Sequence, residues 1–325
     1  MCTSITLYKE DFLFGRNMDL DYSFGGRITV TPRNFPLMFR CAVPLNSHYA
    51  MIGMTSVLAE DFPLYAEAAN EKGLCMAGLD FPFNAYYPEA AAHEKEKISP
   101  FELIPWVLGQ CADVDSALTL LSRTATVGVN YSSHVMLTPM HWHIADKNRS
   151  VVAEPMKDGL RIHENPVGVM TNNPPFEFHM ADLCRYANLI PCDPESSFSR
   201  AAGLRPFSGG LGSVGLPGDF SSSSRFVKAA YLRHFSVCGG GMSAVMQMFH
   251  LLDSVAVVKG SVISSRGKFT VTDYSCCIDP VRKIYYLKSY ENSSVAAVRM
   301  TEDNADGNRL IHFRRSCEPQ IGFVN

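Results

Sequence analysis

The chain has 325 residues, 46% hydrophobic and 19% charged, a composition typical of a globular protein that can bury a sizeable core. Its formal net charge of -3 provides no electrostatic attraction to nucleic acid or to an acidic membrane surface, so neither is expected as a partner. No apolar run reaches the roughly 18 residues of a membrane span, and the first ten residues lack the apolar segment of a secretory signal.

The first candidate catalytic group is Cys2, directly after the initiator Met1. Once Met1 is removed, the Cys2 thiol shares a residue with a free α-amine. That amine titrates near ~7.7–8 and can accept the thiol proton. This is the arrangement of an N-terminal nucleophile. Taken alone, the dipeptide more often means an inert cysteine, since buried cysteines are common.

Two strands, Thr3–Tyr8 and Phe12–Arg16, are predicted to form a hairpin that returns Arg16 toward Cys2. Further strands near Arg27–Thr31 and Tyr49–Met54 favour an antiparallel sheet. Arg16 would share a strand face with apolar residues and be partly buried. A desolvated guanidinium beside a thiol favours the thiolate.

Asp19 follows closely and could orient an ammonium group or a thiol proton. The competing interpretation is a structural Arg16–Asp19 pair that ties a strand end to a turn. Loops beside these strands are the expected site of a binding pocket, because binding residues concentrate on loops held by a rigid scaffold. Its candidate apolar lining, which could instead be simple cover for the core, is Met18, Leu20, Phe24, Leu58 and Ala59.

Three helices follow from local signals. Ser99, Pro100 and Glu102 together predict a helix start with a capping box. A second helix is predicted from Asp113. A third has a core-facing stripe formed by Met242, Val245, Met246, Phe249 and Leu252.

Strand-like sequence returns between 134 and 170, where His141 and His143 would share one face. A metal site is conceivable there, but the sequence offers no third ligand at a recognisable spacing, and no metal is expected. Asn172 then stands where a strand ends and a helix begins. Its side-chain amide could donate to a developing oxyanion, or it could serve as an ordinary turn residue before Asn173-Pro174.

Residues 191–224 are rich in Pro, Gly and Ser and form a long excursion. The segment Gly210–Gly215 matches a dinucleotide-binding pattern, which we reject because Pro217-Gly218 follows where a helix would be required. Arg225 lies in the first turn of the next predicted helix, where a cation opposes the helix dipole. It is therefore either a solvated surface residue or a residue kept for another purpose.

The final strands are predicted at Thr272–Ile278, Lys283–Leu287 and Val295–Met300. Strands at both ends of the chain, with paired helices between them, indicate two stacked sheets covered by helices. Local pattern supports an α+β protein with one large domain over residues 1–325. Ten cysteines without a Cys-x-x-Cys pair do not form a disulfide framework, so reduced thiols in a cytoplasm are expected.

Six ordered motifs resemble the choloylglycine hydrolase family, which comprises bile salt hydrolases and penicillin V acylases. They are Met1-Cys2-Thr3, Phe14-Gly15-Arg16-Asn17-Met18-Asp19, Asn70-Glu71-Lys72-Gly73-Leu74, Gly78-Leu79-Asp80-Phe81-Pro82, Thr171-Asn172-Asn173-Pro174, and Gly215-Leu216-Pro217-Gly218-Asp219-Phe220 continuing through Ser224-Arg225-Phe226. The resemblance implies the four-layer α/β/β/α sandwich of the N-terminal nucleophile hydrolases. It also implies a bacterial cytoplasmic enzyme, assembled as a homotetramer through the excursion at 191–224.

By the same resemblance, Cys2 is the nucleophile, Asn172 supplies one oxyanion donor, and Arg225 lies near the nucleophile and holds Asp19. Asp80 departs from the family, in which bile salt hydrolases usually carry Asn there and a penicillin V acylase can carry Tyr. A carboxylate has no proton to donate at neutral pH. We therefore expect the Asp80 backbone amide to be the second donor, and its carboxylate to adjust the charge near the substrate head group.

The implied activity is hydrolysis of glycine- or taurine-conjugated bile acids through a thioester acyl-enzyme, with no metal or organic cofactor. The bile salt branch is favoured by Arg16-Asn17-Met18-Asp19, by the Asn-Glu-Lys-Gly stretch and by the excursion. Penicillin V or acyl-homoserine lactone acylase activity is the alternative within the same mechanism. A catalytically silent member that only binds or assembles is the alternative from another class.

Overall fold

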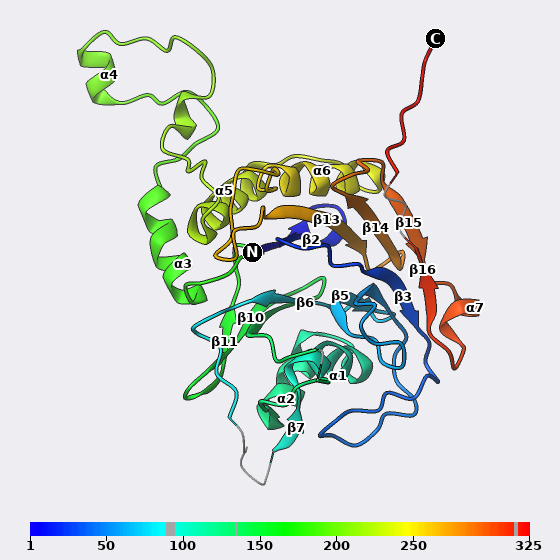
Figure 1. Cartoon of the computed structure of the whole chain (residues 1–325). Coiled ribbons are helices and arrows are strands. Elements are labelled where there is room, and N and C mark those ends of the chain that lie inside the picture. Colours follow the sequence, from blue (N-terminus) through cyan, green and yellow to red (C-terminus); the bar gives the residue numbers. More distant parts are fainter. Residues whose placement is uncertain (89–94, 134, 315–317) are drawn as a thin grey trace.

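The computed structural model describes residues 1–88, 95–133, 135–314 and 318–325. Two large antiparallel sheets lie face to face at its centre, with helices on both outer faces (Figure 1). The first sheet has six strands in the order β12-β1-β2-β13-β14-β15. Their bounds are Cys2–Tyr8 for β1, Phe12–Leu20 for β2, Val169–Met170 for β12, Val271–Asp279 for β13, Ile284–Ser289 for β14 and Ala296–Arg299 for β15.

The second sheet has eight strands in the order β11-β10-β9-β6-β5-β4-β3-β16. Their bounds are Arg27–Thr31 for β3, Met51–Thr55 for β4, Tyr65–Asn70 for β5, Cys75–Asp80 for β6, Met140–Ala145 for β9, Ser150–Met156 for β10, Gly159–Glu164 for β11 and Ile311–Phe313 for β16. A short parallel pair, β7 (Glu96–Ile98) and β8 (Thr124–Thr126), lies apart from both sheets.

Helices cover the outside of each sheet. Helices α5 (Ser222–Phe235) and α6 (Met242–Asp253) pack on the six-stranded sheet, while α1 (Leu103–Gln110) packs on the eight-stranded sheet beside α2 (Val114–Arg123) (Figure 1). One buried cluster fills the space between the sheets and beneath α5 and α6, and a second lies under α1 and α2. The predicted four-layer α/β/β/α sandwich is therefore confirmed.

The hairpin of β1 and β2 sets the position of the N-terminus. It pairs Tyr8 with Phe12 at the turn and Cys2 with Met18 at the open end. Strand β2 continues to Leu20, beyond the predicted end at Arg16, because it also pairs with β13 on its other side. This extension places Asp19 inside a strand instead of a turn.

Two helix predictions need correction. Ser99 makes no cap, because its hydroxyl donates to the Val129 carbonyl and the Glu102 carboxylate accepts from the Arg40 amide. The predicted capping box is therefore wrong, and residues Pro100–Glu102 form a 3₁₀ turn before α1. Asp113 does cap α2, with reciprocal hydrogen bonds to Ser116.

In α6 the buried stripe is rotated from the predicted one. Val245, Phe249 and Leu252 face the core as expected, but Met242 and Met246 are 58% and 41% exposed. Ala244, Met248 and Leu251 take their places against the six-stranded sheet.

The excursion at 191–224 leaves the body of the protein and carries α4 (Ser197–Ala201) at its far end (Figure 1). It follows α3 (Phe176–Leu183) and returns directly into α5. A short helix, α7 (Glu302–Ala305), precedes β16. Among the described residues no helix is both long and apolar enough to cross a membrane. The nine cysteines within the described ranges are free thiols, and Cys317 lies outside those ranges.

Candidate active site

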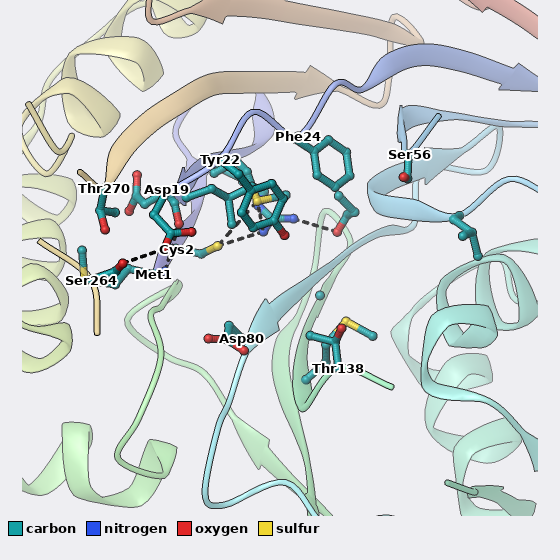
Figure 2. Close-up of a pocket in the computed structure, with 18 of the residues that line it drawn as sticks. Met1, Cys2, Asp19, Tyr22, Phe24, Ser56, Asp80, Thr138, Ser264 and Thr270 are labelled. Atoms are coloured by element: carbon teal, nitrogen blue, oxygen red, sulfur yellow. Dashed lines mark hydrogen bonds between the residues drawn. The ribbon is translucent and has the colours of Figure 1, made fainter. Parts of the chain in front are cut away.

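A cavity of about 670 Å³ opens at the end of the β1–β2 hairpin, between loops of both sheets. This volume lies within the range of roughly 300–1,000 Å³ that is usual for small-molecule sites. Figure 2 shows Cys2 on one side of the open space, with Asp80 and Thr138 across from it.

Cys2 lies at the inner end of this cavity, and the residue is only 2% exposed. Its sulfur is 3.0 Å from Nη2 of Arg16, which is within hydrogen-bond distance, and 3.8 Å from Sδ of Met18. Strand alternation explains the group, because Arg16 and Met18 project from one face of β2 and Cys2 stands opposite Met18 in the adjacent strand. The predicted return of Arg16 to Cys2 is present.

Arg16 is fully buried and is held from the opposite sheet. Its Nη1 donates to the Ala66 carbonyl at 2.8 Å and to the Glu67 carboxylate at 2.9 Å. The hydroxyls of Tyr274 and Tyr285 also donate to Glu67. Burial works against the charged guanidinium, yet the negative charges around it, that of Cys2 first among them, hold the pKa of Arg16 well above its usual value.

Sequence reasoning missed Glu67. The available signal was a single carboxylate in the otherwise apolar strand Tyr65-Ala66-Glu67-Ala68-Ala69, since a buried Glu requires a cation or several donors.

Met1 extends β1 by one residue against Asp19. The Met1 α-ammonium donates to the Asp19 carbonyl at 2.9 Å, and the Asp19 amide donates to the Met1 carbonyl at 3.1 Å. The amide nitrogen of Cys2 donates to Oδ1 of Asn172 at 2.7 Å. Met1 therefore lies on the cavity wall and covers the residue that follows it.

The Asp19 carboxylate lies on the outer side of β2. Its Oδ1 accepts from the Thr272 hydroxyl at 2.6 Å, while its Oδ2 is buried and has no hydrogen-bond partner among the described residues. Nη1 of Arg225 is 3.9 Å from Oδ2, which makes this an ion pair without a hydrogen bond. Burial raises the pKa of Asp19, and the charge of Arg225 opposes that rise.

Arg225 is 1% exposed, so the interpretation as a solvated surface residue is wrong. From the first turn of α5 it donates to the Cys2 carbonyl, to the Thr3 hydroxyl at 2.6 Å and to Oδ1 of Asn172 at 2.9 Å. Burial lowers its pKa. The first turn of α5 is an unfavourable place for a cation, but this position directs the Arg225 side chain toward the end of β1.

Asn172 and Asp80 meet at the cavity. Because Oδ1 of Asn172 accepts from two donors, its Nδ2 is the donor to the Asp80 carbonyl at 2.7 Å, and one amide hydrogen is left over. The Phe81 amide donates to the Pro139 carbonyl of the chain leading into β9. Successive residues of an antiparallel strand point their N–H and C=O groups to opposite neighbours, so those of Asp80 point away from β9. Its N–H therefore points to the same side as the carbonyl that Asn172 contacts. Burial raises the pKa of the Asp80 carboxyl.

Of the five residues predicted to line a pocket, Met18, Leu20, Phe24 and Leu58 lie on the cavity wall. Ala59 does not, and this prediction needs correction. Its side chain is buried in the cluster under α1 that contains Phe62 and Trp106, because the chain turns inward directly after the exposed Leu58.

The cavity wall also includes a distant segment that sequence reasoning missed, residues 262–266 and Thr270. Asp21 fixes this segment through an ion pair with Arg266 and by accepting from the Ser264 hydroxyl at 2.6 Å. No periodic pattern in that stretch could have identified it.

His141 and His143 are both buried on β9 but have separate partners. Nε2 of His141 contacts the Thr171 carbonyl at 2.9 Å, and its Nδ1 contacts Glu154. The ring of His143 is bonded to the hydroxyls of Ser4 and Ser150, each at 2.8 Å. The residues described by the structure contain no group of three or more His, Cys, Asp or Glu that could hold a metal ion.

The whole chain is similar to proteins that are already known. The family model described as linear amide C–N hydrolases, choloylglycine hydrolase family, matches residues 2–313. A bile salt hydrolase/transferase from Lactiplantibacillus plantarum is 43% identical, with 100% of both chains covered. The crystal structure of a variant of conjugated bile acid hydrolase from Clostridium perfringens has a TM-score of 0.90 at 34% identity, again over 100% of both chains. A penicillin V acylase from Agrobacterium tumefaciens, at 20% identity and a TM-score of 0.74 over 95% of this chain and 90% of that one, shares the fold.

Proposed function

Because the chain belongs to the choloylglycine hydrolase family of linear amide C–N hydrolases, we propose that it hydrolyses the amide bond of glycine- or taurine-conjugated bile acids. The observation that carries this proposal is the position of Cys2. Its sulfur lies 3.0 Å from the buried Arg16 guanidinium on the wall of a 670 Å³ cavity. Full-length relatives at 43% and 35% identity are named bile salt hydrolase/transferase.

The reaction begins once Met1 has been removed. The new α-amine of Cys2 takes the thiol proton, directly or through water, and the sulfur attacks the amide carbonyl. Asn172 already accepts from the Cys2 nitrogen, and Oδ2 of Asp19 is a buried acceptor, with no hydrogen-bond donor among the described residues, for the ammonium group that forms. The same ammonium protonates the departing glycine or taurine amine. Water then hydrolyses the thioester with the Cys2 amine as base.

The oxyanion is stabilised by the remaining Nδ2 hydrogen of Asn172 and by the Asp80 N–H, which face the same side of β6. Arg16 supports the thiolate from within the sheet sandwich. Arg225 fixes the end of β1 and the orientation of Asn172, so that the amide oxygen faces Cys2 and the amide nitrogen faces Asp80.

The cavity wall suits a steroid acyl group, because its accessible groups are mainly apolar side chains, among them Leu20, Phe24 and Leu58. Asp80 places a carboxylate at the reacting end, so the anionic head group is best accommodated toward solvent. Penicillin V acylase activity is the second candidate, since the same catalytic set would serve it.

The test is an intact-mass measurement followed by incubation of that sample with taurocholate, glycocholate and penicillin V. We expect loss of Met1 and release of taurine or glycine, both amino acid products disappearing in Cys2→Ser. A trimmed chain that prefers penicillin V would keep the mechanism and replace the substrate. A trimmed chain inactive on all three would overturn the proposal, and a retained Met1 without turnover would favour a silent binding member.

We also propose that the excursion at 191–224 mediates a homotetramer and that the protein acts in the cytoplasm. The first statement is supported by three large apolar side chains that the projecting excursion exposes within residues 198–207, namely Phe198, Leu204 and Phe207. The free thiols support the second. Light scattering after size exclusion, for the whole chain and for F198S/F207S, tests the assembly.

A further inference from the structure

His141 lies behind the two segments that carry the oxyanion donors, and the mechanism above does not use it. We propose that His141, fixed by Glu154, is a positioning residue that holds the Asp80 and Asn172 segments in register with each other. The proposal rests on the proposed function, because it concerns the same acyl-transfer site.

The first half of the argument is contact. The His141 ring stacks flat on Phe81, the residue after Asp80, with ring centroids 4.2 Å apart and planes 7° apart. Its Nε2 contacts the carbonyl of Thr171, the residue before Asn172, at 2.9 Å. One buried side chain therefore contacts the immediate neighbour of each donor, and its exposed fraction is 1%.

The second half is the placement of protons. A carbonyl only accepts, so Nε2 of His141 carries a hydrogen. Nδ1 faces Oε1 of Glu154 at 3.2 Å, and that oxygen also accepts from the Phe176 amide at 3.0 Å. Both ring nitrogens of His141 therefore have a polar partner. The orientation of the ring is thereby determined at both nitrogens.

Glu154 extends the effect to the whole Asn172 turn. By holding the Phe176 amide it fixes the first residue of α3, while His141 fixes Thr171 at the other end of the turn. The turn between them also receives His179, whose Nε2 contacts the Asn172 carbonyl at 2.9 Å. Because these contacts hold the backbone of Asn172, one hydrogen of its side-chain amide remains available to the oxyanion.

The positions of the two oxyanion donors affect the rate of acylation. Oxyanion donors act when they lie about 2.7–3.1 Å from the developing charge, and a displacement of about 1 Å can reduce the rate by ~10²-fold. Alkylation of a thiol at a saturated carbon develops no oxyanion. The ratio of acylation to alkylation of Cys2 therefore reports the oxyanion site separately from the reactivity of the thiol.

The decisive variant is His141→Asn, in which the amide stands where Nδ1 was, and both the Thr171 bond and the ring stack are lost. The matched control is His143→Asn, on the same face of β9, because His143 is equally buried but its hydrogen-bond partners are the side chains of Ser4, Ser150 and Asn165, none of which adjoins Asp80 or Asn172 in the sequence. His141→Gln restores a nitrogen near the Nε2 position and serves as the conservative variant.

The measurements use the full-length protein whose Met1 loss has been verified by mass. Acylation is followed with p-nitrophenyl acetate and alkylation with iodoacetamide. For His141→Asn we expect acylation to fall by about 10- to 100-fold, with the alkylation rate within about a factor of two of wild type. His143→Asn should change neither, and His141→Gln should recover part of the acylation.

Unchanged acylation in His141→Asn, or an equal loss of acylation and alkylation, would overturn the proposal. If that variant does not fold, Phe81→Leu, which removes only the ring stack, has to show the same selective loss. Wild-type turnover of glycocholate is measured in parallel. Because p-nitrophenyl acetate is not a bile salt, failure on glycocholate alone overturns the proposed substrate and leaves the role of His141 under test.

Discussion

Replacing Glu67 by Gln tests a fully buried ion pair of the site. Glu67 is fully buried and accepts from Arg16, Tyr274 and Tyr285. Gln keeps the length and one acceptor oxygen but removes the charge. Arg16 then stays buried at 1% exposure without its carboxylate partner. Breaking one side of a buried pair costs about 3–5 kcal/mol in free energy of unfolding.

Glu102→Gln is the matched control. Glu102 is also fully buried, but its cationic partner Arg40 is 30% exposed and can turn into water when the charge is lost. The remaining effect is that of the hydrogen bond from the Arg40 amide, about 1 kcal/mol. The two Glu→Gln variants should therefore differ by at least roughly 2 kcal/mol.

Urea denaturation followed by circular dichroism and by tyrosine fluorescence gives both free energies, provided that the two probes yield coincident transitions. Equal losses in free energy of unfolding for Glu67→Gln and Glu102→Gln would refute the reasoning, because the burial of the cation would then make no difference to the cost. So would a stabilised Glu67→Gln variant.

Three further outcomes are expected. Asp80→Asn should increase kcat/KM for glycocholate several-fold at neutral pH, because it removes a charge that repels the oxyanion. Burial raises the pKa of Asp80, and the gain should shrink as the pH falls through that pKa, where the wild-type carboxyl becomes neutral. An identical pH profile and identical substrate preference in the two proteins would contradict this. Burial lowers the pKa of His143 to about 3, so the unfolded chain takes up a proton below about pH 6.5 while the folded protein does not. Stability should then fall by about 1.4 kcal/mol per pH unit from roughly pH 6.5 toward pH 3, and urea titrations of His143→Asn should lack this contribution. Leu58→Asp should raise KM without loss of stability, because Leu58 lies on the cavity wall. Ala59→Leu should reduce the free energy of unfolding by about 1–3 kcal/mol with little change in KM, because Ala59 lies in the buried cluster. Reversed effects would show that the cavity wall has been misassigned.

Strand and layer arrangement followed from the sequence where periodicity was strong. The predicted strand Arg27–Thr31 is present with those bounds, and the last three predicted strands appear within two residues of β13, β14 and β15. The length of β2 could not be predicted from the local sequence, because it depends on pairing with β13, which begins more than 250 residues further along the chain. The capping box at Ser99 failed for a related reason, since Val129 and Arg40 offered its side chains better partners.

The candidate site shows the same division. The residues that the family resemblance proposed for the site come together around one corner of the cavity: Cys2, Arg16, Asp19, Asp80, Asn172 and Arg225. Glu67 and His141 act through contacts across the sheet sandwich, and no short spacing reveals them. Ala59 was misassigned because exposure changes between adjacent residues of a turn, which a local apolar pattern does not resolve.

Strand β2 also limits how such a sequence can change over evolutionary time. Arg16 and Met18 face Cys2 from one side of it, while Asn17 and Asp19 use the other side to contact β13 and its surroundings. Inserting or deleting one residue within β2 would exchange these two sets, so its length is not open to variation. The cavity wall, by contrast, is built largely from loops that tolerate changes in length. New substrates can therefore arise by loop variation while the strand that carries the reacting groups keeps its length.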